Sequence, residues 1–121
     1  MAQARDDLRA AERLANDPDL APRIACFLAH LAAEKALKAG LIVEGTRSHR
    51  THDLLDLTKR LPSPLRTRVS GDDLDLLNVW ATEGSIRLTW TEATRNEAIE
   101  CHAAAARLID QVSAWLEAIP D

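Results

Sequence analysis

The longest periodic apolar segment of the chain, residues 20–43, places the tightest constraint on its fold. Large apolar side chains recur there at the three- and four-residue steps of one helix face, and Gly45 follows where glycine suits a helix C-terminus. No apolar run approaches the ~18 residues that cross a bilayer, so the segment predicts the central helix of a bundle and excludes an integral membrane protein. The apolar stripe consists of Ile24, Phe27, Leu28, Leu31 and Ile42.

The rest of the chain also favours helices over strands. Ala and Leu supply 39 residues, whereas Val, Ile, Phe, Trp and Tyr together supply 14. Thr94 and Glu97 have the spacing of a capping box, which predicts the start of the last helix. We therefore expect one all-α domain over residues 1–121, a five-helix up-and-down bundle with short connections. The predicted helices cover residues 3–16, 20–43, 53–61, 72–86 and 94–118.

The net charge of −4 is unevenly distributed along the chain. Residues 47–68 carry six Lys or Arg against two Asp or Glu, while residues 69–121 carry three against ten. The basic segment also contains His49 and His52, so it is either the natural place for contact with phosphates or a solvated loop. No apolar run follows the charged start, which predicts a cytoplasmic chain. Without CxxC spacing, two cysteines are expected to be buried and unpaired: Cys26 and Cys101.

Charged residues interrupt the apolar stripe of residues 20–43. Helical geometry puts Lys35 and Lys38 almost on the same line as Ile42. In one interpretation Lys38 pairs with Glu34 one turn earlier, and the lysine stems extend to solvent. In the other, the interruption marks a cleft or a subunit interface where the two lysines serve binding.

A second group of candidate residues lies at the start of the last predicted helix. Arg95 and His102 are seven residues apart, a rotation of about 700° on a helix, so both project from nearly one face. Such a pair can cleave RNA without a metal, because a neutral imidazole accepts the proton of a 2′-hydroxyl while the guanidinium binds the phosphate. Asn96 could position either group. The alternative is structural: Ile99 and Ile109 lie on the same face, and His102 could be a core histidine.

Other catalytic and metal-binding patterns are absent from the sequence. It contains no HExxH, no Gly-rich phosphate loop, no GxSxG and no Cys/His set at zinc spacing, so we expect neither a metal nor a cofactor. Arg47 and His52 repeat the order of an arginine and a histidine, but such spacings arise by chance among 15 Lys and Arg and four His. His52 or Asp53 is instead a candidate cap for the third helix. The tryptophans expected to pack in the core or an interface are Trp80, Trp90 and Trp115.

Three motifs occur in the order of the predicted helices: Asp6-Asp7-Leu8 in the first, Ala33-Glu34-Lys35-Ala36-Leu37-Lys38 in the second and Thr51-His52-Asp53-Leu54 at the start of the third. Together they resemble the HEPN family of small prokaryotic helical domains. The second motif paired with the third is more specific than either alone, and the resemblance covers nearly the whole chain. It implies a five-helix bundle that often dimerises and is commonly encoded beside a minimal nucleotidyltransferase. In many members it implies the RNase toxin of a toxin–antitoxin pair.

The resemblance also implies roles for individual residues. The family's catalytic motif is an arginine followed by a polar residue and, a few residues later, a histidine near the start of the last helix; Arg95, Asn96 and His102 match it. A nucleotide-binding branch often carries Arg-Tyr-Pro where this chain has Arg87 followed by Leu and Thr. Another variant has a tyrosine two residues after the histidine, which the partner adenylylates. That position is Ala104 and the chain has no tyrosine, which excludes this form of silencing.

The leading hypothesis is a metal-independent RNA endonuclease, the toxin of a pair with a nucleotidyltransferase antitoxin. His102 would act as acid and base, Arg95 as phosphate clamp and Asn96 in support. We expect a homodimer whose two-fold interface brings the last helices together, because two Arg/His pairs form a cleft. The alternative is a non-catalytic nucleotide- or protein-binding module that docks on a nucleotidyltransferase partner. Residues expected to bind RNA or nucleotide are Lys35, Lys38, Arg47, Arg50 and His52.

Overall fold

The computed structural model describes residues 1–43, 51–80 and 93–119, and all regular elements in these ranges are α-helices. The all-α class is therefore confirmed, and none of the helices in the described ranges is both long and apolar enough to cross a membrane. In chain order the helices are α1 (Ala2–Asn16), α2 (Pro22–Val43), α3 (Leu54–Lys59), α4 (Ser63–Arg66), α5 (Gly71–Asn78) and α6 (Arg95–Glu117).

Two helices differ from the prediction. α5 ends at Asn78, and residues 81–86 of the helix predicted there lie outside the described residues. α4 is a single turn in a stretch predicted as a loop. Pro64 sits in its first turn, where a missing N–H leaves no helical hydrogen bond unmade, so proline is compatible with this short helix. Leu65 of α4 is fully buried, which shows that tertiary packing stabilises the turn.

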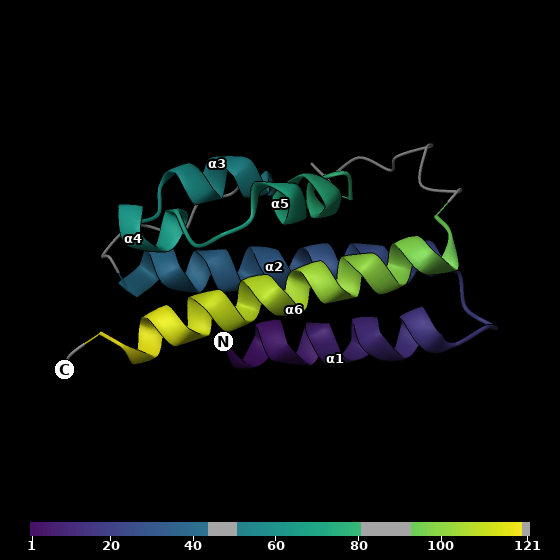
Figure 1. Cartoon of the computed structure of the whole chain (residues 1–121). Helices are drawn as coiled ribbons and strands as arrows, with labels where there is room; N and C mark the ends of the chain where they lie inside the picture. The colour runs from purple at the N-terminus through teal and green to yellow at the C-terminus, as the bar shows by residue number, and fades with distance from the viewer. Residues whose placement is uncertain (44–50, 81–92, 120–121) are drawn as a thin grey trace.

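The helices form two layers (Figure 1). The long helices α1, α2 and α6 lie side by side, and the short helices α3, α4 and α5 cover α2 and α6. The short connection between α1 and α2 makes these two helices antiparallel. α6 runs parallel to α2, because the layer of short helices returns the chain to the end of the bundle where α2 begins.

Alanine side chains fill much of the contact between the three long helices. Because small side chains allow helix axes to approach closely, α1, α2 and α6 pack with few large residues between them. Gly40 of α2 serves the same purpose against the second layer: a Cβ there would lie 3.2 Å from Leu61 and 3.5 Å from Leu65. The buried alanines are Ala4, Ala11 and Ala15 of α1, Ala25, Ala29, Ala32, Ala33 and Ala36 of α2, and Ala98, Ala104 and Ala105 of α6.

The side of α2 that carries the apolar stripe of residues 20–43 does not face the core at either end. Ile24 is 41% exposed and Ile42 is 61% exposed. The residues of the stripe between them, Phe27, Leu28 and Leu31, are only partly buried. α2 buries instead its opposite side, with the alanines, Leu37 and Leu41. α2 is apolar nearly all round, so the spacing of its large residues does not identify the side that faces the core.

Several local predictions are confirmed. Asp53 accepts hydrogen bonds from the backbone N–H groups at the start of α3, and Thr94 and Glu97 form a capping box at the start of α6. Cys26 and Cys101 are free and buried, and Trp80 is buried. Trp115 packs partly buried against the core. Trp90 lies outside the described residues.

Candidate functional site

Arg95, the predicted phosphate clamp, contacts the end of α1. Its Nη1 donates to the carbonyl oxygens of Leu14 at 3.0 Å and Ala15 at 3.1 Å, and its Nη2 donates to that of Leu20 at 2.8 Å. The last carbonyls of a helix have no partner within the helix, and a cation near them is favoured by the helix dipole. The guanidinium therefore joins the start of α6 to the end of α1 and the turn before α2.

His102 lies on the same side of α6 as Arg95, and both face α1, as their spacing predicts. Its Nε2 is 3.5 Å from Oε2 of Glu12 on α1, and its side chain is 23% exposed. Ile99, one turn earlier on this face, is 45% exposed, whereas Ile109, two turns later on it, is fully buried. His102 therefore lies at the edge of the core, partly exposed to solvent. Asn96 is exposed on the first turn of α6.

Glu34 is contacted by side chains from two parts of the chain, α2 itself and the segment just before α3. It is 6% exposed. His52, just before α3, places Nδ1 2.8 Å from Oε1 of Glu34, and Lys38 donates from Nζ to Oε2 at 3.0 Å. His30 places Nε2 3.5 Å from Oε1. The predicted pairing of Glu34 with Lys38 is confirmed, but the carboxylate also has two histidines that this interpretation did not include.

The pKa of Glu34 reflects two opposing effects. Burial raises the pKa, but the polar contacts with His30, His52 and Lys38 outweigh burial and lower it from 4.5 to about 2. The carboxylate is therefore ionised at neutral pH and can only accept hydrogen bonds. His30 is fully buried, and its Nδ1 lies 3.2 Å from the carbonyl oxygen of Leu77, so the ring also links α2 to α5.

The structure brings only some of the predicted binding residues together. Lys38 and His52 meet at one carboxylate. Lys35 lies one turn from them but forms an ion pair with Asp7 of α1, with 2.6 Å between Nζ and Oδ2. These three basic side chains therefore already face carboxylates of the same chain. Two further residues of the set lie outside the described residues: Arg47 and Arg50.

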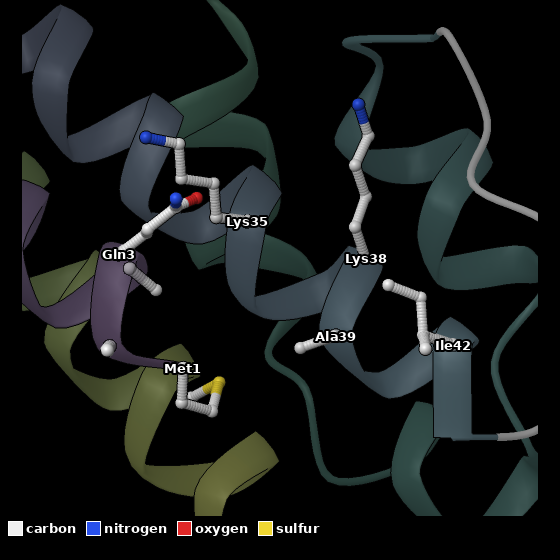
Figure 2. Close-up of a pocket in the computed structure, with 8 residues that line it drawn as sticks. Met1, Gln3, Lys35, Lys38, Ala39 and Ile42 are labelled. Carbon is white, nitrogen blue, oxygen red and sulfur yellow. The ribbon is translucent and has the colours of Figure 1, made fainter.

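A hollow of about 390 Å³ lies where the first turn of α1 meets the C-terminal half of α2. Figure 2 shows Met1, Ala39 and Ile42 around it, with Lys35 and Lys38 at one rim. Both lysine ammonium groups point away from Met1 and Ala39. The hollow thus presents apolar surface rather than two free positive charges. Within the described ranges, no three His, Cys, Asp or Glu side chains are arranged to hold a metal ion.

The three motifs noted in the sequence are in contact with one another. Asp7 of the first pairs with Lys35 of the second, and Glu34 of the second binds His52 of the third. The sequence analysis did not identify Glu34 as the common partner, although the co-occurrence of these motifs was a signal for contact between them. His30 was also missed. It lies outside all three motifs, and only its position one turn before Glu34 points to it.

Comparisons with known proteins support one family. The HEPN domain model matches residues 1–115 of the chain. The crystal structure of TT1696 from Thermus thermophilus is 28% identical in sequence with a TM-score of 0.76, covering 93% of this chain and 92% of that one. The structure of ST0689, an archaeal HEPN homologue, is 23% identical with a TM-score of 0.69, covering 95% and 93%. No curated protein gives a significant match.

Proposed function

This chain belongs to the HEPN domain family, and from this premise we propose that the chain is a non-catalytic module that docks on a nucleotidyltransferase partner. The observation that carries the proposal is the engagement of Arg95 with three carbonyl oxygens at the end of α1. To clamp a phosphate, the guanidinium would have to give up its hydrogen bonds to the carbonyl oxygens of Leu14, Ala15 and Leu20, and a hydrogen bond to a charged group contributes about 1.5–3 kcal/mol. The motif arginine thus has a structural use here that does not require catalysis.

A further observation favours docking of a protein over binding of a nucleotide. Lys35, Lys38 and His52 already face carboxylates, so they do not form a free phosphate-binding cluster. The partner class follows from the family, whose members are commonly encoded beside a minimal nucleotidyltransferase.

A ribonuclease toxin is the second candidate, and the position of His102 favours it. The imidazole is partly exposed and faces the carboxylate of Glu12, and a carboxylate beside a histidine can orient the ring for proton transfer. In this candidate Arg95 exchanges the carbonyls of α1 for an RNA phosphate, with Asn96 beside it.

Cleavage of single-stranded RNA in EDTA separates the two candidates. As a binding module, the purified chain shows no cleavage above that of His102→Ala. As a ribonuclease, it leaves 2′,3′-cyclic phosphate ends, spares DNA, and loses ~100-fold or more of its rate in His102→Ala. Glu100→Gln, an exposed change on the same helix, is the matched control. Metal-independent cleavage that depends on His102 would overturn the proposal.

The docking half of the proposal is tested with a purified minimal nucleotidyltransferase encoded beside this chain. We expect the two proteins to co-elute in size-exclusion chromatography at about 10 μM, which detects dissociation constants in the micromolar range. The complex should persist with His102→Ala, because catalysis is not involved. Separate elution of the two proteins at this concentration would contradict docking.

A further inference from the structure

The two cysteines lie in the core at the same end of the bundle. Cys26 is in the second turn of α2, and Cys101 is in the second turn of α6. Both thiols are free and fully buried. Because α2 and α6 pack against each other and run parallel, their first turns lie at one end of the molecule (Figure 1). The fold therefore brings together two thiols that are far apart in the sequence.

A contact between Gly40 and Val112 fixes the register of the two helices. A Cβ on Gly40 of α2 would lie 3.9 Å from the Cγ1 of Val112 on α6. Cys26 precedes Gly40 by 14 residues, and Cys101 precedes Val112 by 11. These steps are about four and about three helical turns, so each cysteine lies on the same side of its helix as the residue in the contact. Along the axes the cysteines lie about 21 Å and about 16.5 Å from that contact, a difference of less than one turn.

The two thiols are hydrogen-bonded to each other. The S–H of Cys101 donates to the sulfur of Cys26, and the indole N–H of Trp80 donates to the sulfur of Cys101. The bond from Cys101 lowers the pKa of Cys26, although burial acts in the opposite direction. The same bond, together with burial, raises the pKa of Cys101, since loss of its proton would leave two thiolates in contact. Cys26 is therefore the thiol that ionises first, and the thiolate is the nucleophilic form of cysteine.

We propose that Cys26 and Cys101 are a redox modification site, which hydrogen peroxide converts into a reversible disulfide between α2 and α6. The Cys26 thiolate attacks one peroxide oxygen and the O–O bond breaks, which leaves a sulfenic acid and a hydroxide that takes up a proton. The Cys101 sulfur then attacks the Cys26 sulfur. The S–O bond breaks, and the second oxygen leaves as water with the proton of Cys101. The two thiols lose two electrons in total, one peroxide becomes two waters, and a dithiol reductant restores both thiols by exchange.

Burial controls the rate of this reaction, and the contact between the thiols controls its product. A fully buried thiol meets an oxidant only through local opening, which is easier near the end of a helix than in its middle. Both cysteines lie in the second turn of their helices. Once Cys26 is a sulfenic acid, Cys101 is already in contact with it and reacts before a second peroxide arrives. Oxidation therefore stops at the disulfide and does not continue to sulfinic acid.

Mass spectrometry of the full chain tests the proposal. After treatment of the folded wild type with hydrogen peroxide, the chain should lose about 2 Da, the mass of two hydrogen atoms. Neither cysteine should then react with an alkylating reagent in denaturant, and a digest without reductant should contain a peptide that links Cys26 to Cys101. Dithiothreitol should restore the mass. Two thiols that persist, a sulfinic acid at either cysteine, or a link between two chains would overturn the inference.

Single serine variants test the order of the two steps. Cys101→Ser leaves Cys26 without its partner, so peroxide should produce a sulfenic acid at Cys26 that dimedone labels. Cys26→Ser removes the nucleophile, and oxidation of Cys101 in this variant should be at least about tenfold slower. Circular dichroism of both variants checks that the helix content is unchanged, and the wild-type digest decides the proposal if either variant fails to fold. Equal oxidation rates in the two variants would contradict the role of Cys26.

Amide hydrogen exchange tests whether the disulfide joins the two helices mechanically. In the oxidised chain the amides around Cys101 should exchange at least about tenfold more slowly than in the reduced chain, because the start of α6 can no longer separate from α2. The peroxide-treated variant with both cysteines replaced by serine is the control and should show no slowing. These measurements use the chain alone, so their outcome does not depend on the nucleotidyltransferase partner. Equal exchange in oxidised and reduced wild type would contradict a link between α2 and α6.

Discussion

Arg95 donates hydrogen bonds to the carbonyl oxygens of three residues near the end of α1, and these bonds set the expected result of removing it. We expect Arg95→Ala to lower the free energy of unfolding by about 1–3 kcal/mol, because the charged guanidinium donates three hydrogen bonds, two of them in a partly buried position. Urea titration measures the change. Arg23→Ala, an exposed arginine on α2, should change stability by less than about 0.5 kcal/mol. An Arg95→Ala chain as stable as the wild type would show that the guanidinium is free for phosphate.

The ionisation of Glu34 makes the free energy of unfolding depend on pH in the acid range. Its pKa falls from 4.5 in the unfolded chain to about 2 in the folded one, so folding favours the ionised form. The stabilisation is complete above about pH 4.5 and is lost as the pH falls toward about 2. Glu34→Gln should therefore destabilise the protein by on the order of 3 kcal/mol at neutral pH, with a difference that shrinks through this range.

Urea titrations at several pH values between about 2 and about 7 measure this dependence. Glu100→Gln, which removes an exposed carboxylate of α6, is the control and should follow the wild type at every pH. A constant difference between Glu34→Gln and wild type across this range would contradict the role given to the contacts with His30, His52 and Lys38.

The start of α6 depends on a capping box that is visible in the sequence. The Thr94 hydroxyl accepts a hydrogen bond from the Glu97 N–H at 3.0 Å, and a Glu97 carboxylate oxygen accepts one from the Thr94 N–H at 3.1 Å. Thr94→Ala should cost about 1 kcal/mol of stability, because one orphaned N–H of the helix loses its acceptor. Thr94→Ser keeps the hydroxyl and should retain most of the stability. Equal melting temperatures for Thr94→Ala and Thr94→Ser would contradict this role.

Local signals located the longer elements but not α4. Asp53 and Thr94 predict the starts of α3 and α6 from the sequence alone, because the backbone N–H that each side-chain oxygen caps is only two or three residues away. The turn at α4 follows a proline and contains another, a pattern typical of a helix stop. It becomes helical because Leu65 is buried close to Gly40 of α2. That contact joins residues far apart in the sequence, and helical periodicity does not report it.

At the scale of the whole molecule, the close packing of α1, α2 and α6 depends on small side chains. Ala104 of α6 is fully buried, whereas Ala114 on the same helix is exposed. Ala104→Leu should cost about 1–3 kcal/mol, since added methylenes force well-packed helices apart. Ala114→Leu changes the same atoms at the surface and should stay within about 0.5 kcal/mol of wild type. Thermal melts of both variants measure the difference; similar values would indicate a loosely packed interface.

The sequence by itself determined the helical class, the positions of most helices and their caps. These properties follow from backbone hydrogen bonds and side-chain spacings that act within a few residues. It also located Arg95, Asn96 and His102 as a motif at the start of α6. Arg95 and His102 do lie on one side of α6, but the carbonyl partners of Arg95 belong to α1 and to the turn after it, 75 to 81 residues earlier.

Tertiary structure alone decided which side of α2 is buried and which carboxylate each basic residue faces. α2 is apolar nearly all round, so its own pattern fits more than one orientation, and the alanine-rich side is buried because it lets α1 and α6 approach. Glu34 contacts His52, 18 residues later in the chain, because α3 packs against α2. Such contacts depend on how the helices pack, and packing minimises free energy over the whole molecule rather than within any one segment.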